Sequence, residues 1–170
     1  TRVVDTSGAV NPHHDNLGHL DGQHGLRPLV GRRIPIVGDD YADPEKGSGA
    51  VKITPAHDFN DFEVGKRHGL PQINVFDKEG HLALVDNEDY LRGLPEGAAE
   101  LAAELNNVDR FAARKQIVAR LENFGFLERV EPNTHMVPHG DRSGAVIEPY
   151  LTDQWDDRDK TLAPPARAAV

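Results

Sequence analysis

Four polar residues whose types suit the binding of an amino acid lie close together in the chain: Lys52, Thr54, Asp58 and Asp61. Lys52 and Thr54 share one face of a predicted strand, because strand side chains alternate with period two. Asp58 and Asp61 are three residues apart and share one face of a predicted helix start. Two carboxylates that face an ammonium and a hydroxyl group form a cradle for a ligand with its own ammonium group, and an amino acid is such a ligand.

These four residues are placed by a predicted strand-to-helix junction. Residues 50–54 alternate as a short strand, which Pro55 ends. A helix from Asp58 to about Lys66 follows, with Asp58 as its N-cap. The buried side of this helix is predicted to come from Phe59, Phe62 and Val64.

Each polar residue of the junction also has a purely structural interpretation. Asp58 is suited to accept free amide hydrogens at the helix start, and Asp61 in the first turn is suited to complement the helix dipole. Lys52 in a short strand is suited to protect a sheet edge. The neighbouring His57 is a candidate general base, although a lone histidine more often has a structural role. No Ser-His-Asp or Cys-His arrangement is recognisable.

The remaining pattern predicts a β-rich α+β fold with helices in the middle of the chain. The first 26 residues are rich in Gly, His, Asn and Asp and are predicted to be mostly loop. Helices are predicted over residues 95–105 and 109–123, the second with an apolar stripe and with Gly125 just past its end. Further strands are predicted over residues 33–37, 73–76, 81–85 and 145–151, with a hairpin turn at Gly80 between the second and third of them.

Four blocks in the same order resemble the editing domain of valyl-tRNA synthetase, an insertion in the class I synthetase body. The longest are GSGAVKITPAHDFNDFEVGKRHG, from Gly47, and VPHGDRSGAVIEPYLTDQW, from Val137. The shorter two are VGRRIPIV with DYAD behind it, from Val30, and RFAARK, from Arg110. The resemblance covers roughly residues 27 to 160. It implies a barrel-like sheet with helices packed around it.

The resemblance implies hydrolysis of threonine from tRNA for valine, with water as the nucleophile and no cofactor. Valine and threonine have nearly the same shape, and an apolar pocket rejects an added hydroxyl poorly, a problem for which valyl-tRNA synthetases are themselves the standard example. By the resemblance, Asp61 holds the substrate's α-amino group, and Asp58 supports it or recognises the threonine hydroxyl. Lys52 and Thr54 line the pocket at the ester and the terminal ribose. The site then works by positioning water and by oriented dipoles.

Three further residues are expected to contact the substrate by the same resemblance. Arg2 corresponds to the arginine of a threonine-rich segment that lines the pocket in the family, although the middle of that segment is missing here. Lys46 stands where some members have an aromatic residue that could stack on the terminal adenine. His57 completes this set.

The expected organisation has three parts. Residues 1–26 form an irregular N-terminal segment of the same domain, residues 27–155 its core, and residues 156–170 an edge that leads toward a synthetase body. Expected partners are that body and the 3′ end of tRNA(Val) carrying threonine. The net charge of −9 predicts weak contact with the phosphates of the RNA body.

Composition excludes several other classes of function. The chain has no cysteine and no long apolar run, and its start lacks a signal peptide pattern, so a cytoplasmic protein without a membrane partner is expected. The spacing of His13, His14, Asp15, His19 and His24 fits no defined metal motif, and no metal site is predicted. The alternative to an editing enzyme is an inactive insertion that binds the tRNA 3′ end or stabilises its parent protein.

Overall fold

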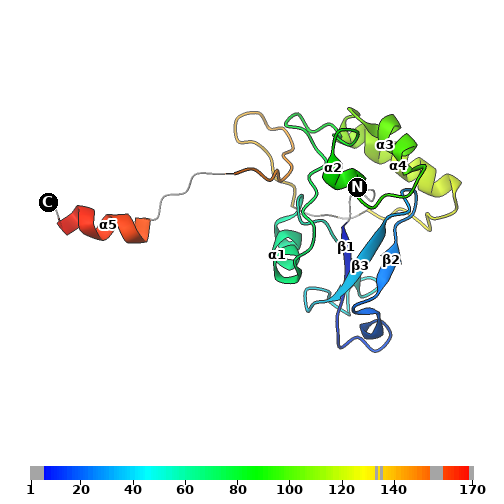
Figure 1. Cartoon of the computed structure of the whole chain (residues 1–170), viewed down its shortest axis with the longest axis horizontal. Coiled ribbons are helices and arrows are strands. Elements are labelled where there is room, and N and C mark those ends of the chain that lie inside the picture. Colours follow the sequence, from blue (N-terminus) through cyan, green and yellow to red (C-terminus); the bar gives the residue numbers. More distant parts are fainter. Residues whose placement is uncertain (1–5, 133, 135, 154–158, 169–170) are drawn as a thin grey trace.

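A four-stranded sheet forms the centre of the computed structural model, which describes residues 6–132, 134, 136–153 and 159–168. Its strands are β1 (Ser7–Val10), β2 (His24–Leu26), β3 (Arg33–Gly38) and β4 (Ala50–Ile53), in the order β2-β3-β1-β4. β1 runs parallel to β3 and antiparallel to β4, and β2 runs antiparallel to β3. Figure 1 shows β1, β2 and β3 side by side.

The N-terminal segment contributes more to this sheet than its composition predicts. Residues 7–26, expected to be mostly loop, contain β1, β2 and a short 3₁₀ helix, η1 (Gly18–Leu20). β1 lies inside the sheet between β3 and β4, and Ala9 is fully buried. Three of the four residues of β1 are buried, and this burial stabilises the pairing of β1 with its neighbouring strands. The amino-acid composition of the segment does not reveal this burial.

The sheet is open among the described residues, so the expected barrel-like closure is not observed, while the mixed α and β composition is confirmed. Residues 73–85 do turn back at Gly80, whose φ is +84°, but they pair through an isolated bridge between Phe76 and Leu82. Regular strands do not form here because a side chain competes for the backbone amides. The Asn106 side chain accepts hydrogen bonds from the amides of Leu84 and Val85, which would otherwise bond to a partner strand.

Helix α1 (Phe59–His68) follows β4, begins after Asp58 as predicted, and ends two residues beyond the predicted Lys66. The Asp58 carboxylate accepts from the amides of Asn60 and Asp61, and Gly69 ends the helix with φ of +61°. Val64 is fully buried, whereas Phe59 is 75% exposed, so the prediction that Phe59 is a core residue is wrong. Phe59 is the first residue of the helix, and the residues of this helix that are buried follow later, at Asp61, Val64 and Gly65.

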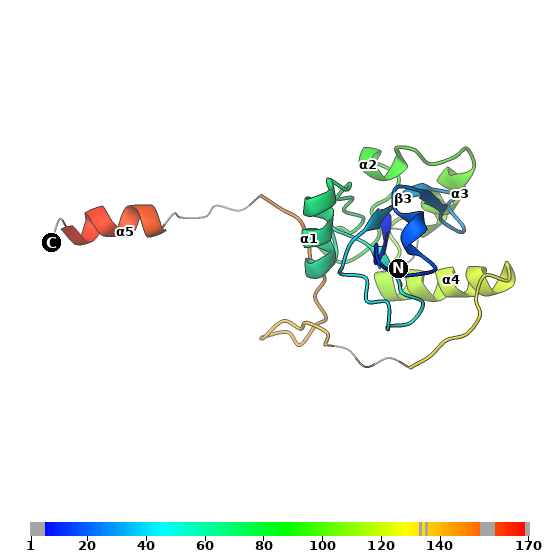
Figure 2. The same cartoon turned by 90° about the horizontal axis from the view of Figure 1, so that it is seen from below.

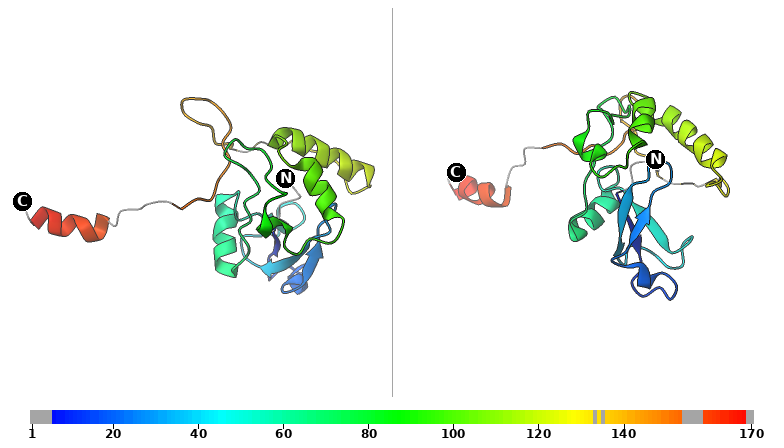
Figure 3. Two further views of the ribbon diagram at one scale, coloured as in Figure 1. Left: turned by 45° about the horizontal axis from the view of Figure 1, so that its top comes forward. Right: turned by 45° about the vertical axis from the view of Figure 1, so that its right-hand side comes forward.

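The main core lies under the other helices: α2 (Glu88–Leu91), α3 (Ala98–Leu105) and α4 (Arg110–Asn123). α4 has Asp109 as its N-cap and is followed by Gly125 at φ +71°. The position of Gly125 past the helix end is as predicted, and α4 buries Ala113, Ile117 and Leu121. Figures 2 and 3 show α1 on one side of the sheet and α3 and α4 on the other. A smaller core joins the sheet to α1 and consists of Ala9, Ala42, Ile53, Val64 and Leu70.

The chain after α4 returns to the side of the molecule where α1 lies (Figure 2). The strand predicted over residues 145–151 is replaced by an isolated bridge between His139 and Val146. Helix α5 (Asp159–Ala168) contains Pro164 and Pro165 and stands apart from the rest of the protein (Figure 1). Within the described residues, no helix combines the length and the apolar character needed to span a membrane.

Candidate functional site

Three of the predicted residues meet through one carboxylate oxygen. Lys52 Nζ lies 3.0 Å from Asp61 Oδ2 and 2.8 Å from Thr54 Oγ1. The backbone amide of Thr54 donates to the same Asp61 Oδ2 at 2.8 Å. The strand places Lys52 and Thr54 on one face, and the first turn of α1 places Asp61 opposite them, as the alternation of strand residues and the helix start predict.

Asp61 is almost entirely buried, with 3% of its side chain exposed, whereas the Lys52 side chain is 52% exposed. A buried carboxylate needs partners for its charge, and here they are the lysine ammonium and the Thr54 amide. The lysine chain is half exposed, so its ammonium group is the solvent-facing member of the pair. Loss of the lysine without a replacement cation would leave the buried carboxylate with the Thr54 amide but, among the described residues, without a charged partner, which is costly.

Asp58 has the structural role that its position predicts. Its Oδ1 atom accepts from the Asn60 amide at 2.9 Å and from the Asp61 amide at 3.0 Å. The same side chain also lines the small cavity described below, so the cap places a second carboxylate beside Lys52 and Thr54.

Tyr41 is a member of the cluster that sequence reasoning did not select. Burial raises the pKa of the Tyr41 hydroxyl, and the charges of Asp61 and Asp58 raise it further. The nearby Asp61 carboxylate thus favours the protonated form of the hydroxyl. Tyr41 lies in the loop after β3, and its position in the Asp-Tyr-Ala-Asp block was the only signal available in the sequence.

His57 connects three segments of the chain. Its Nε2 accepts from the Val75 amide at 3.1 Å, and its Nδ1 donates to the Pro149 carbonyl at 3.2 Å. This pairing assigns the neutral tautomer with the proton on Nδ1. Burial lowers the pKa of His57, the Pro149 carbonyl opposes that change, and the Lys52 charge adds to it. Because both ring nitrogens are engaged, the geometry gives His57 a positioning role.

A cavity of about 80 Å³ lies over this cluster. Lys52, Thr54 and Asp58 line it from the junction. Asp61 is bonded to Lys52 and Thr54 but is not itself part of the lining. The opposite wall contains Arg110, whose Nε pairs with Glu148 Oε1 at 3.1 Å and whose Nη2 donates to the Val146 carbonyl at 2.8 Å. This wall therefore joins the start of α4 to Glu148 of the returning segment, and no local pattern in the sequence predicts that contact. The remaining lining residues are His57, Phe76, Arg114 and Glu148.

The other two predicted contacts are not part of this cavity as described. Arg2 lies outside the described residues. Lys46 is highly exposed in the loop before β4 and pairs with Asp43 at 3.2 Å. The N-terminal segment does approach the junction, because the Thr6 amide donates to the Ile53 carbonyl at 3.0 Å and Thr6 is buried.

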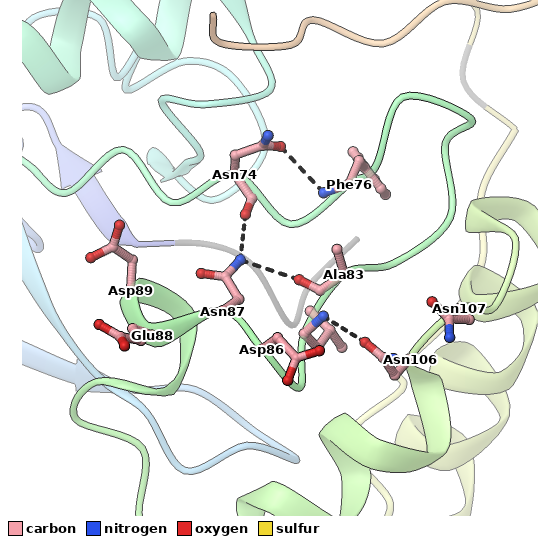
Figure 4. Close-up of a pocket in the computed structure, with 10 residues that line it drawn as sticks. Asn74, Phe76, Ala83, Asp86, Asn87, Glu88, Asp89, Asn106 and Asn107 are labelled. Atoms are coloured by element: carbon pink, nitrogen blue, oxygen red, sulfur yellow. Dashed lines mark hydrogen bonds between the residues drawn. The ribbon is translucent and has the colours of Figure 1, made fainter.

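A larger pocket elsewhere is rich in amides and acids but is organised for structure (Figure 4). The Asn87 amide donates to the carbonyls of Asn74 and Ala83, and its oxygen accepts from the Tyr90 amide. Asn106 accepts from Leu84 and Val85, and Asn74 accepts from Phe76. These amides hold backbone groups in place of regular strands. No group of His, Cys, Asp and Glu suited to a metal ion occurs among the residues described.

Comparisons with known proteins agree on one family. Residues 3–122 match the sequence model described as leucyl-tRNA synthetase, editing domain. The whole chain is 69% identical over 170 residues to the valine–tRNA ligase of Rhodopseudomonas palustris and 69% identical to that of Bradyrhizobium diazoefficiens. It is 58% identical to the valine–tRNA ligase of Brucella suis over 173 residues. The chain spans 18% of the length of the first two relatives and 19% of the third.

Proposed function

We propose, because the chain belongs to the family of aminoacyl-tRNA synthetase editing domains, that it hydrolyses the ester between an incorrect amino acid and tRNA. The relatives are valine–tRNA ligases, and threonine is the amino acid whose shape is nearest to valine among those with a hydroxyl group. The proposed substrate is therefore threonyl-tRNA(Val). The proposed setting is the cytoplasm, as part of a synthetase that holds the body of the tRNA.

The observation that carries this proposal is the Lys52 ammonium held 3.0 Å from the buried Asp61 carboxylate, because Lys52 itself lines the small cavity. A cationic nitrogen already occupies the place in which the α-ammonium of an aminoacyl ester would be bound. Since the lysine chain is half exposed, the substrate's ammonium can replace it on Asp61. Lys52 is then released toward the ester carbonyl, where its positive charge stabilises the developing oxyanion.

Asp58 and Thr54 complete the proposed binding of threonine. The Asp58 carboxylate on the cavity wall accepts from the substrate's ammonium or from its side-chain hydroxyl. The Thr54 hydroxyl contacts the terminal ribose. A valyl ester lacks the hydroxyl and leaves that contact unmade, so it is held less well than the threonyl ester.

Water attacks the ester carbon, and the tRNA 3′ end leaves as the free ribose hydroxyl. The ring nitrogens of His57 are engaged with backbone groups, so the proposed mechanism assigns no general base to His57. Catalysis comes from holding water, ester and Lys52 in one small cavity. An ester is an activated substrate, which suits a site built on positioning.

The test is the release of threonine from purified threonyl-tRNA(Val), with valyl-tRNA(Val) as the control substrate. Faster release of threonine than of valine, lost in Asp61→Ala, supports the proposal. An Asp61→Ala variant that stays folded and deacylates at the normal rate contradicts the anchor role of Asp61. A folded wild-type chain that releases neither amino acid favours the alternative, an inactive insertion domain.

A further inference from the structure

Glu148 lies where three pockets of the protein meet. It lines the cavity of about 80 Å³ that Lys52 and Thr54 also line, and it lines two larger grooves of about 450 Å³ and 650 Å³. No other described residue lines all three of them. Water that enters the cavity through either groove therefore passes the Glu148 carboxylate.

The segment that carries Glu148 turns an acid toward the cavity and the preceding apolar side chain toward solvent. Ile147 is 50% exposed, whereas 30% of the Glu148 side chain is exposed. Of two such neighbours, the apolar side chain is normally the one that is buried. The reversed arrangement indicates that the acid has a role in the cavity.

The backbone is held in place on both sides of Glu148. Before it, the Val146 carbonyl accepts from Arg110 Nη2 at 2.8 Å. After it, the Pro149 carbonyl accepts from His57 Nδ1 at 3.2 Å. Glu148 is therefore a carboxylate in a fixed position, although its segment is not part of a regular strand.

The Glu148 carboxylate has one oxygen engaged and one available. Oε1 pairs with Arg110 Nε at 3.1 Å, and Oε2 has no partner within the part of the chain that the structure describes. The ion pair orients the carboxylate, and Oε2 can still accept a hydrogen bond or a proton. In contrast, both ring nitrogens of His57 are engaged, and Asp58 Oδ1 caps α1.

We propose that Glu148 is a catalytic residue that accepts a proton from the attacking water. This proposal rests on the proposed function, since it takes the threonyl ester to lie over Lys52 and Thr54. The water oxygen bonds to the ester carbon while one of its O–H bonds breaks, and that proton passes to Glu148 Oε2. The resulting oxyanion collapses, the bond from this carbon to the ribose oxygen breaks, and Glu148 gives the proton to the ribose oxygen. The products are threonine and the free ribose hydroxyl, and the carboxylate is restored.

The test measures kcat and KM for the release of threonine from threonyl-tRNA(Val) by the 170-residue chain and its variants. Glu148→Gln keeps the size of the side chain and an oxygen for Arg110, but its amide does not take the proton of the water. We expect this variant to lower kcat by about 100-fold or more, the contribution of a general base, with KM nearly unchanged. Glu148→Asp keeps a carboxylate and should retain more activity than Glu148→Gln.

Two further variants separate proton transfer from a structural role. Sodium formate should raise the rate of Glu148→Ala in proportion to its concentration, because it supplies the missing carboxylate, and should not raise the rate of the wild-type protein. The matched control is Glu104→Gln, because Glu104 also pairs with an arginine of α4, Arg120. This control should release threonine at the wild-type rate. Urea unfolding checks that each variant is folded.

Release of threonine by Glu148→Gln at the wild-type rate would overturn the proposal. An equal loss in Glu148→Asp and Glu148→Gln, with no effect of formate on Glu148→Ala, overturns it as well, since Glu148 then only holds Arg110. These outcomes leave the proposed function intact, because the wild-type chain still releases threonine. A folded wild-type chain that releases no threonine contradicts the proposed function and the role of Glu148 together.

Discussion

Asp61 connects the strand and the helix of the candidate site. Its Oδ2 atom accepts from both Lys52 Nζ and the Thr54 amide, and its charge raises the pKa of the Tyr41 hydroxyl. The spacing of residues 52 to 61 predicts that Lys52, Thr54 and Asp61 meet, because strand alternation and the helix start are local properties. Tyr41 could not be found in that way, since the loop after β3 reaches Asp61 only in the folded chain.

Replacement of Asp61 by asparagine separates its charge from its role in the fold. The amide oxygen of Asp61→Asn can still accept from the Thr54 amide, so we expect a smaller loss of unfolding free energy than in Asp61→Ala, which leaves that amide unpaired at a cost of about 1–3 kcal/mol. Both variants should lose deacylation. Urea unfolding and threonine release measure the two effects, and an active Asp61→Asn variant would show that the negative charge is dispensable.

His57 makes the stability of the protein depend on pH. Burial lowers its pKa in the folded state, against a value of about 6.5 in an unfolded chain. The folded state therefore binds fewer protons, and the contribution of His57 to stability is complete above about pH 6.5 and is lost as pH falls through the folded pKa.

The measurement for His57 is the unfolding free energy of the wild-type protein and of His57→Gln between neutral pH and pH 5. The advantage of the wild-type protein should shrink as pH falls, because only it has the titrating ring. Parallel pH profiles for the two proteins would contradict the structural role assigned to the neutral tautomer.

Helix ends are the best-predicted elements of this chain, because capping is local chemistry. Asp58 and Asp109 cap α1 and α4, and Gly69 and Gly125 follow their last turns with positive φ. The hairpin predicted between residues 73–76 and 81–85 does turn at Gly80 and pairs through a bridge, but neither it nor residues 145–151 form regular strands. Some of their backbone groups bond to side chains that lie far away in the sequence. The Val146 carbonyl accepts from Arg110 and the Pro149 carbonyl from His57, and no local pattern contains those partners.

The two aspartate caps form a matched pair for testing the role of Asp58 in binding. Asparagine caps helices as well as aspartate does, so Asp58→Asn and Asp109→Asn should each change the unfolding free energy by less than about 1 kcal/mol. Asp58→Asn should lower kcat/KM for threonyl-tRNA(Val) about tenfold, the loss expected for one hydrogen bond to a charged group. Asp109→Asn should not alter it. If Asp58→Asn and Asp109→Asn are equally active, the proposed role of Asp58 in substrate binding is wrong and Asp58 acts only as the N-cap of α1.

At the scale of the whole molecule, the candidate site depends on a segment that returns from the far end of α4. Arg110 attaches that segment through Glu148 and the Val146 carbonyl. A Cβ atom on residue 80 would meet the end of the Arg110 guanidinium, so a side chain at this turn would require the guanidinium to shift. The family resemblance identified the blocks from Arg110 and from Val137 as parts of one domain. It did not predict that Arg110 contacts Glu148 at the wall of the cavity.

Gly80→Ala should release the returning segment. Alanine at positive φ costs about 1–2 kcal/mol, and here it also displaces Arg110 from Glu148. Gly125→Ala is the control, because Gly125 has a similar φ of +71° and no atom within 4 Å of a built Cβ. Hydrogen exchange of residues 139–151 should accelerate in Gly80→Ala and not in Gly125→Ala. If hydrogen exchange of residues 139–151 is unchanged in both variants, Arg110 does not hold the returning segment in place.

The most direct test of the proposed site is a crystal structure of the chain with the amide analogue of threonyl-adenosine, which cannot be hydrolysed. We predict the threonine nitrogen at about 3 Å from the Asp61 carboxylate, in place of Lys52 Nζ, with the ammonium of Lys52 turned toward the amide carbonyl. An analogue bound in the pocket of Figure 4, or one whose amino group contacts neither Asp61 nor Asp58, would contradict the proposed site.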